Sequence, residues 1–207
     1  MRKLMIAAIA VVGLSATGLA QQQVKFGPKA GVNFSKISDI DDAEMKTGFH
    51  VGAVAEIKFN DKFSVQPELL YSTQGAKIDK NGFEADFKND YINIPIMAKY
   101  YIVDGFSVEA GPQVGFLMKS ESEFSSLIGP GGGVSGTFDT KDSYKSVDFG
   151  VNFGLAYDLP QGFFVNARYN LGLSKINEDD GALGNMSLQN KDFKNNVIQI
   201  GIGFKFD

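Results

Sequence analysis

His50 is the only histidine of the sequence, and histidine is the side chain that ordinarily gains or loses a proton near neutral pH. A histidine beside a serine is the arrangement by which many hydrolases and acyltransferases activate a nucleophile. Ser35 and Ser72 would lie on neighbouring strands if the chain forms a β-sheet, but no motif brings them to His50. We interpret His50 as a polar interior residue, and we predict no catalytic residue and no enzyme activity.

Metal and phosphate binding would need residues that the sequence supplies only in short runs. One histidine and no cysteine exclude a His/Cys metal cluster. The glycine-rich run 129–133 lacks the Lys-Ser/Thr pair of a phosphate-binding loop. Short acidic runs in loops are usually solvated, so we predict no metal site and no cofactor. The acidic residues that could offer oxygen ligands to Ca²⁺ are Asp39, Asp41, Asp42 and Glu44, with Glu178, Asp179 and Asp180.

The first twenty residues have the order of a secretory signal peptide. A positive start is followed by an apolar core at 4–14 and by small residues up to Ala20. The apolar core is too short for a membrane-spanning helix, which needs about 20 such residues. We therefore expect cleavage between Ala20 and Gln21, with 1–20 as the signal peptide and 21–207 as a single domain.

Net charge and cysteine content indicate which partners and which cellular compartment are compatible with the sequence. Without the two basic residues of the leader, 18 Lys and Arg stand against 24 Asp and Glu, a net charge of −6. This balance argues against nucleic acid as a partner. Cysteine is absent, so neither disulfides nor lipid attachment at a cysteine is available. Export without disulfides indicates the envelope of a Gram-negative bacterium, and we expect an outer-membrane location.

The elements that would position these residues are strands, because apolar and polar residues alternate with period two through almost all of the mature sequence. Val147 and Phe149, for example, share one face, and Asp148 and Gly150 share the other. No mature stretch is apolar enough for a spanning helix, so only a closed barrel could hold the chain in a membrane. The eight alternating segments are 24–35, 49–59, 63–72, 92–102, 106–116, 147–158, 163–174 and 197–206.

The connections between these segments alternate strictly between short and long. Turn residues fill the short ones, at 60–62, 103–105 and 160–162. Short periplasmic turns and long external loops are typical of outer-membrane barrels, in which both mature termini then face the periplasm. The sequence therefore predicts an all-β fold, an eight-stranded antiparallel up-and-down transmembrane β-barrel. Long polar loops are expected at 36–46, 74–90, 118–146 and 175–195.

Two soluble all-β folds would show the same alternation. A β-sandwich exposes one face of each strand, which should carry many Lys, Glu and Thr, whereas here that face is rich in Gly, Asn and Gln. A lipocalin-like barrel keeps apolar residues inside and polar residues outside. Periodicity alone does not decide which face is outside. Export, the alternating connections and the Phe-rich last strand favour apolar residues that face lipid.

If the polar face lines the lumen, an eight-stranded barrel fills that lumen with its own side chains. Buried acids and bases must then pair, because an unpartnered buried charge is costly. We expect Arg168 to meet Glu68 or Glu109 near the middle of the barrel, and the sequence does not choose between them. The predicted interior polar network consists of Glu56, Gln66, Glu68, Lys99, Glu109, Gln113, Asp148 and Arg168.

Aromatic residues suggest how the barrel would meet its surroundings. Tyrosines near segment ends could form girdles at the two membrane interfaces. Phe206, one residue before the C-terminus, is typical of the signal that the barrel assembly machinery recognises during insertion. The girdle candidates are Tyr71, Tyr91, Tyr100, Tyr157 and Tyr169.

Several motifs resemble the PorT-like outer-membrane β-barrel family of Bacteroidetes. The segment 65–75, VQPELLYSTQG, resembles its third strand, and 91–96, YINIPI, with Lys99-Tyr100 resembles its fourth. The resemblance covers 24–207 and implies an OmpA/OmpX-type eight-stranded barrel and a Bacteroidetes source. The secretion role of the member that names the family is not carried over. Matches to the fifth, sixth and seventh strands are Gly111-Pro112, Asp148-Phe149-Gly150, Arg168-Tyr169 and Gly172-Leu173.

The sequence thus favours a structural or interaction protein that is anchored in the outer membrane and presents external loops from a barrel filled with side chains. The alternatives are a narrow channel for small solutes and an outer-membrane lipid-modifying enzyme or hydrolase. The expected partners are outer-membrane lipid, the barrel assembly machinery and an extracellular or envelope protein that the sequence does not identify.

Overall fold

A computed structural model of the chain describes residues 23–38, 43–80, 83–127, 133–141, 144–176 and 193–206. The expected signal peptide and its cleavage site lie outside these residues, as do the glycine-rich run before Gly133 and the acidic runs apart from Glu44. Among the described residues, no helix combines the length and the apolar character that a helical membrane span requires.

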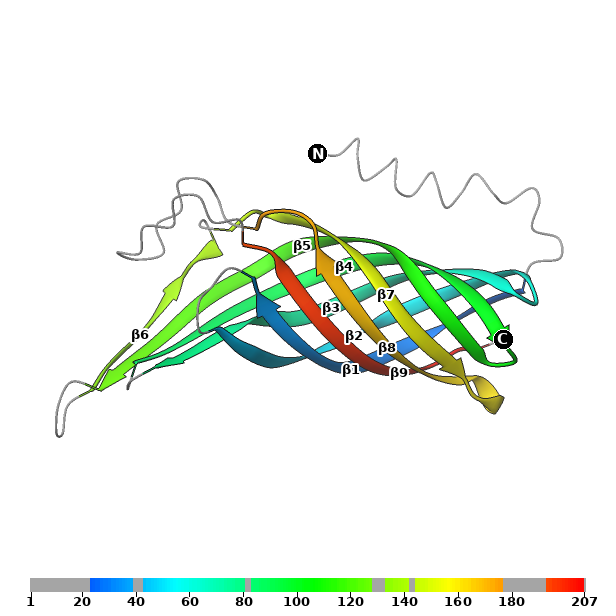
Figure 1. The fold of residues 1–207 in the computed structure, drawn as a ribbon, viewed down its shortest axis with the longest axis horizontal. Coiled ribbons are helices and arrows are strands. Elements are labelled where there is room, and N and C mark those ends of the chain that lie inside the picture. The colour runs from blue at the N-terminus through cyan, green and yellow to red at the C-terminus, as the bar shows by residue number, and fades with distance from the viewer. Residues whose placement is uncertain are drawn as a thin grey trace.

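Nine antiparallel strands make up the described fold, and eight of them close a ring (Figure 1). Strand β1 pairs with both β2 and β9, and β4 pairs with β5, which leaves no break around the ring. The predicted eight-stranded antiparallel barrel is confirmed. The strands are β1 (Gln23–Ile37), β2 (Ala43–Asn60), β3 (Phe63–Lys80), β4 (Phe83–Val103), β5 (Phe106–Leu127), β6 (Gly133–Asp139), β7 (Val147–Asp158), β8 (Phe163–Gly172) and β9 (Asn195–Phe204).

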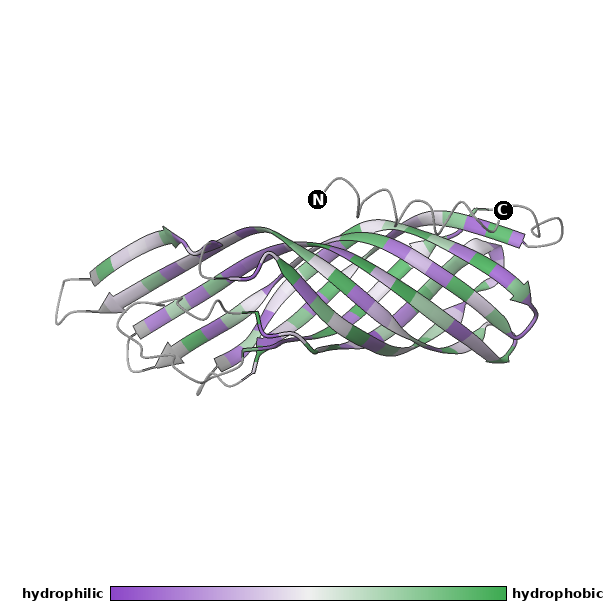
Figure 2. Cartoon of the chain, turned by 90° about the horizontal axis from the view of Figure 1, so that it is seen from above, coloured by the Kyte–Doolittle hydropathy of each residue, from purple (hydrophilic) through white to green (hydrophobic). Residues whose placement is uncertain are grey.

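The ring has an apolar outside and a polar inside. Strand β8 alternates exposed and buried residues over its whole length, and the exposed ones are apolar or aromatic. Figure 2 shows the same alternation of hydrophobic and hydrophilic residues around the barrel. Large apolar side chains that are exposed in this way form a belt, as a lipid environment requires.

The belt ends along a defined row of paired residues. Tyr71 of β3 pairs with Ile92 of β4, which pairs with Phe116 of β5, which in turn pairs with Val147 of β7. From Phe63 to this row β3 is nine residues long, and a barrel strand needs about 9–11 residues to cross the hydrocarbon. We call the end of the barrel that carries the short turns the turn end. We call the other end, beyond this row, the loop end.

Three of the four expected long loops are wrong over much of their length. Strands occupy 74–80 and 83–90, most of 118–146, and 36–37 and 43–46 of the loop expected at 36–46. Strands β3 and β4 pair without interruption out to Lys80 and Phe83. Strand β5 runs to Leu127 and pairs there with β6, which stays outside the ring. Past the belt neither face of these strands meets lipid, so charged residues occupy one face and the segments have the polar composition expected of loops, while the backbone pairing continues.

At the turn end, neighbouring strands are joined by the short turns that the sequence predicts. The side chain of Asn60 accepts hydrogen bonds from the backbone N–H groups of Lys62 and Phe63, both at 2.9 Å. Gly105 and Gly162 have φ values of 77° and 89°, the left-handed region that favours glycine. A short 3-10 turn, η2 (Pro160–Gly162), makes the third connection.

Candidate functional site

Arg168 lies inside the barrel and binds two carboxylates at once. Its Nη1 and Nη2 donate to the two carboxylate oxygens of Glu68 at 2.8 and 2.6 Å. Its Nε and Nη2 donate to the two oxygens of Glu109, the second at 3.1 Å. Lys29 donates to Glu68 at 3.0 Å. Two cations thus neutralise two carboxylates whose side chains are 0% exposed, and we call these four residues the central ion cluster.

A second balanced group, the turn-end ion cluster, lies closer to the short turns. Lys205 donates to Glu56 and to Asp158, the latter at 2.7 Å. The ammonium of Lys99 lies 3.6 Å from Glu56 and 3.5 Å from Asp158. The hydroxyl of Tyr101 is within hydrogen-bond distance of the same two carboxylates, 2.6 Å from Asp158. The two clusters therefore place no net charge in the lumen.

The other predicted network residues take separate places. Gln66 connects the clusters, because its amide nitrogen donates to Glu68 at 2.7 Å and its oxygen lies 3.5 Å from the Lys99 ammonium. Gln113 accepts from Asn152 at 3.2 Å, and Asp148 accepts from Ser174, so neither joins an ion cluster.

Sequence reasoning missed Lys29, Tyr101 and Asp158 as members of the network. Each occupies an inward position of its alternating segment, so the period-two pattern already indicated the face on which it lies. Lys29 pairs with Glu68, 39 residues away in sequence, and the period-two pattern shows the face of each residue but not which residues meet.

Gly154 allows the central ion cluster to form. Glu109 pairs with Gly154 across β5 and β7, and Gly154 pairs with Arg168 across β7 and β8. A Cβ atom on Gly154 would lie 2.5 Å from the carbonyl oxygen of Ala167 and 2.7 Å from Cγ of Arg168. The arginine side chain therefore passes over the glycine to reach Glu109.

We expect Gly154→Ala to destabilise the barrel by about 1–3 kcal/mol, because the added methyl displaces Arg168 and meets backbone. Urea unfolding in lipid vesicles, read as the heat-dependent gel mobility of the folded barrel, would measure the cost. Gly115→Ala is the matched control, since its Cβ would meet only side chains, the nearest being Asn93 at 2.8 Å. Equal costs for the two variants would contradict the role given to Gly154.

His50 does not form a catalytic pair with a serine. Its Nδ1 lies 2.8 Å from Oδ1 of Asn33, and the amide nitrogen of Asn33 donates to Ser72 at 2.9 Å. Asn33 thus stands between the imidazole and that hydroxyl. Ser35 donates instead to the carbonyl oxygens of Lys46 and Gly75. His50 is 1% exposed, so its imidazole is buried in the lumen.

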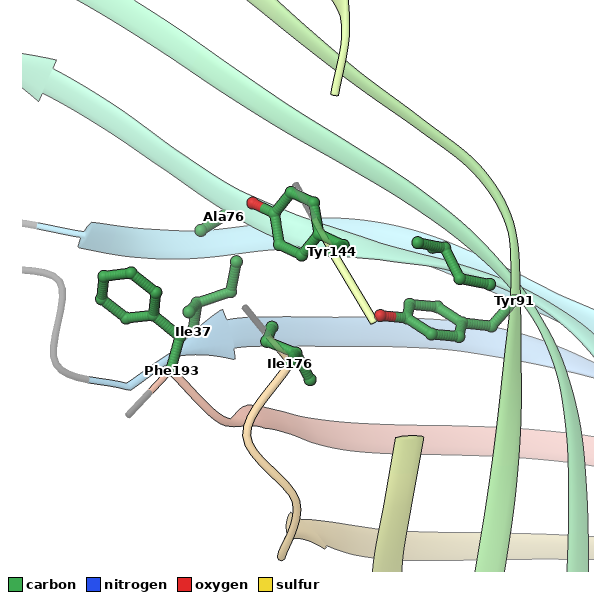
Figure 3. Packing of buried hydrophobic residues seen from close by; sticks show 7 residues of the cluster. Ile37, Ala76, Tyr91, Tyr144, Ile176 and Phe193 are labelled. Atoms are coloured by element: carbon green, nitrogen blue, oxygen red, sulfur yellow. The ribbon is translucent and has the colours of Figure 1, made fainter. Parts of the chain in front are cut away.

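The loop end of the lumen is closed by a small hydrophobic cluster, the loop-end cap (Figure 3). Tyr91 belongs to it and is 1% exposed, so its expected place in an outer aromatic girdle is wrong. Side chains two residues apart on a strand lie on the same face, so Tyr91 faces inward like Asn93. Tyr100, Tyr157 and Tyr169 do face outward. The cap consists of Ile37, Ala76, Tyr91, Leu117, Tyr144, Ile176 and Phe193.

Three cap residues come from segments outside the strands, and backbone hydrogen bonds hold these segments together. The N–H of Lys145 donates to the carbonyl of Ile176 at 2.7 Å, and the N–H of Ile176 donates to that of Phe193 at 2.9 Å. Burial raises the pKa of the Tyr144 hydroxyl to about 12, so it stays neutral in the cap. The cap closes the lumen above the ion clusters.

Phe193→Ala is expected to cost about 3–5 kcal/mol of unfolding free energy, because the ring is 3% exposed and its removal leaves a cavity in the cap. The same urea titration in vesicles would measure it. Phe138→Ala provides the control, because that ring is 57% exposed and its loss should change stability by about 0.5 kcal/mol or less. A small effect at Phe193 would mean that the cap does not stabilise the barrel.

Beyond the belt, β3, β4 and β5 continue together with β6 as a protruding sheet, residues 72–80, 83–91, 117–127 and 133–139 (Figure 1). One face carries charged pairs, such as Lys88 with Glu123 at 2.6 Å. The other face carries apolar residues, among them Phe124 and Phe138, whose rings stack with centroids 5.2 Å apart. The protruding sheet is thus amphipathic, although it lies outside the barrel.

The turn end has an open cavity of about 490 Å³. Glu56, Asp158 and Lys205 of the turn-end ion cluster form part of its wall, together with Lys25 and Lys58. Asp158 is partly exposed to the cavity, whereas Glu56 and Lys99 behind it are 0–1% exposed, so these buried ion pairs form the inner limit of the cavity.

Comparisons with known proteins agree with this architecture. Ail, the attachment invasion locus protein of Yersinia pestis, matches with a TM-score of 0.51 and 18% identity, over 89% of this chain and 99% of Ail. Neisserial surface protein A matches over 89% of this chain and 99% of its own, with 15% identity and a TM-score of 0.47. At 18% identity the similarity to Ail shows the fold. A comparison with curated protein sequences found no match.

A family model described as "Outer membrane protein beta-barrel domain" matches residues 19–178. This range covers most of the ring, from β1 through β8. Because the match extends over more than half of the sequence, the chain belongs to the outer membrane protein beta-barrel domain family and is an integral β-barrel protein of the Gram-negative outer membrane.

Proposed function

We propose that this protein is an interaction protein, which its barrel anchors in the outer membrane and whose protruding sheet binds a partner outside the cell. The observation that carries the proposal is the length of the strands. β3, β4 and β5 are 18, 21 and 22 residues long, about twice what the hydrocarbon requires. The additional residues form an ordered, amphipathic surface beyond the membrane, which an anchor alone would not need.

The orientation follows from the connections. Barrels of this class keep short turns in the periplasm and send longer connections outward, so the loop end and its protruding sheet face the exterior. The proposal includes removal of residues 1–20 on export and insertion by the assembly machinery from the periplasmic side. The strand motifs at 65–75 and 91–96 support a place near the PorT-like barrels of Bacteroidetes.

The closed lumen argues against the channel alternative. A solute would have to displace the loop-end cap and then separate ion pairs whose carboxylates are 0% exposed. In planar bilayers we expect no steady conductance from the wild-type protein. A stable ohmic current carried by the folded barrel would instead favour a small-solute pore.

A shortened variant tests the interaction proposal. Thr73 and Asp90 are cross-strand partners, so 74–89 can be replaced by an Asn-Gly turn that preserves the register. Leu117 and Ser146 are joined by a backbone hydrogen bond, so 118–145 can be replaced in the same way. The belt and both ion clusters remain, whereas the cap loses Ala76 and Tyr144, so the folded state of the variant is verified before attachment is measured.

We expect this variant to reach the outer membrane and to keep heat-dependent gel mobility, while cells that express it lose attachment to one another and to protein-coated surfaces. The full-length chain expressed at the same level is the reference, and cells without the protein set the background. Undiminished attachment by the shortened barrel would overturn the proposal.

A further inference from the structure

Strand β6 has one edge without a strand beside it in the described part of the chain. Its other edge pairs with β5 from Glu121 to Leu127. The N–H of Thr140 donates to the carbonyl oxygen of Ser120 at 3.1 Å. This bond shows which residues of β6 direct their backbone N–H and C=O groups toward β5 and which direct them away from it. Even-numbered residues of β6 direct N–H and C=O toward β5, so those of Ser135 and Thr137 point to the open edge.

This edge lacks the usual protection against pairing. Natural edge strands are commonly guarded by lysine, proline or a bulge. Gly133–Asp139, GVSGTFD, contains no lysine, arginine or proline, and it pairs with β5 without a register shift. Its two large apolar side chains, Val134 and Phe138, are 51% and 57% exposed. An unguarded edge with alternating apolar residues is a template for another strand.

The sequence of β6 is complementary to itself when two copies run antiparallel. Full overlap of the seven residues places Gly136 opposite Gly136 of the second copy, on a two-fold axis. Ser135 then faces Thr137 of the second copy, and both have backbone groups that point to the open edge. In the register of greatest overlap, the residues whose N–H and C=O groups point to the open edge therefore lie opposite each other, as antiparallel pairing requires.

The same register matches the side chains. Val134 lies opposite Phe138 of the second copy in a non-hydrogen-bonded pair, the kind in which opposing side chains come closest. Aromatic and β-branched residues are favourable cross-strand partners. The Phe124 ring lies over Gly136 and stacks on Phe138 on the same face. Pairing would cover the exposed apolar residues of both edges.

Geometry then decides where the second copy must be. An antiparallel pair within one continuous sheet has its two-fold axis perpendicular to that sheet. The protruding sheet continues away from the barrel along the long dimension of the molecule (Figure 1, Figure 2). An axis perpendicular to it runs roughly along the membrane plane, so the rotation points the second barrel in the opposite direction.

We propose that the β6 edges of two copies pair antiparallel about Gly136 and thereby connect two facing outer membranes. This inference rests on the proposed function and names its partner as a second copy of the same chain. It makes the protein a homophilic contact between neighbouring cells, held by main-chain hydrogen bonds and by the Val134–Phe138 contacts.

Single cysteines test the register, because the chain has none of its own. Two residues in a non-hydrogen-bonded antiparallel pair have Cα atoms about 4.5 Å apart, within the range of a disulfide. Gly136→Cys barrels, each in its own lipid nanodisc, should form a disulfide-linked dimer under mild oxidation. The Cβ of this cysteine meets the rotatable rings of Phe124 at 2.9 Å and Phe138 at 3.5 Å and no backbone atom among its nearest contacts.

Ser135→Cys is the matched control, since in this register it lies opposite Thr137 and about 7–8 Å from its own copy. Alone it should give little dimer, whereas a mixture of Ser135→Cys and Thr137→Cys discs should give the mixed dimer. Strong dimerisation of Ser135→Cys alone, or none with Gly136→Cys, would overturn the two-fold at Gly136.

Proteoliposome clustering tests the edge itself. Thr137→Pro removes an N–H that points to the open edge, and Thr137→Val keeps it. Vesicles with the wild type or Thr137→Val should cluster, and vesicles with Thr137→Pro should lose clustering while the barrel stays folded by gel mobility. Clustering that survives Thr137→Pro contradicts the inference. If cells attach to surfaces but vesicles never cluster, the homophilic contact fails and the interaction function stands; if neither occurs, both fail.

Discussion

Glu68→Ala is expected to lower the unfolding free energy of the barrel by about 3–5 kcal/mol, because it breaks buried ion pairs by removing one partner. Glu68 accepts hydrogen bonds from Lys29 and from Arg168, and all three side chains are 0–1% exposed. Without the carboxylate, two buried cations share Glu109 alone. The chain has no tryptophan, so urea unfolding in vesicles is best followed by gel mobility.

Glu123→Ala is the matched control for this prediction. Glu123 also pairs with a lysine, at 2.6 Å, but the two side chains are 45% and 40% exposed. Exposed pairs contribute about 0–1 kcal/mol, so this variant should unfold near the wild-type midpoint. A similar loss in both variants would mean that burial does not determine the strength of the central ion cluster.

A double variant separates charge balance from lost packing. Glu68→Leu combined with Lys29→Met removes one charge of each sign and leaves Arg168 with Glu109. Buried ion pairs replaced by apolar residues of similar size often cost little. We therefore expect the double variant to be more stable than Glu68→Ala. A double variant at least as unstable as Glu68→Ala would argue that the carboxylate acts through its shape and not through its charge.

The barrel was predictable because lipid on one side and a filled lumen on the other impose opposite polarities on successive residues. Strand β8 follows this rule at every position. The rule ends with the belt. Lys77 of β3 and Lys88 of β4 both lie in regular strands, yet their segments were expected to be loops. There water meets the charged face and no lumen lies behind the other, so these segments have the polar composition of loops, and composition alone does not reveal the strands.

The pairing of interior charges was harder to predict than the face on which they lie. Period two places Arg168 inside, but which carboxylate it meets depends on how the strands are staggered around the ring. Glu109 and Arg168 are both cross-strand partners of Gly154, so they lie in one row of the sheet. Glu68 contacts Arg168 from the opposite side of the lumen. The cap was missed for a related reason, since Tyr144 and Phe193 lie in segments without periodicity and become buried only through backbone contacts with other segments.

Ile96→Arg is expected to destabilise the barrel by about 2–4 kcal/mol, the cost of a lipid-facing arginine near the middle of a bilayer. Ile96 lies on the outward face of β4, between Ile92 at the loop-end margin of the belt and Ile102 near the turn end. Nothing in the protein pairs with an outward arginine at this depth. Equilibrium folding into lipid vesicles over a range of urea concentrations would measure the effect.

Ile102→Arg is the control that makes this test decisive. The two isoleucines lie on the same strand and face, and their exposed fractions are nearly equal, 49% for Ile96 and 54% for Ile102. For a barrel in water the two arginines would therefore cost the same. For a barrel in lipid, Ile102→Arg should cost only about 0–1 kcal/mol, because its charge reaches the interface. A difference between the variants in vesicles thus measures the depth of the belt directly, and equal costs would remove lipid as the environment of that face.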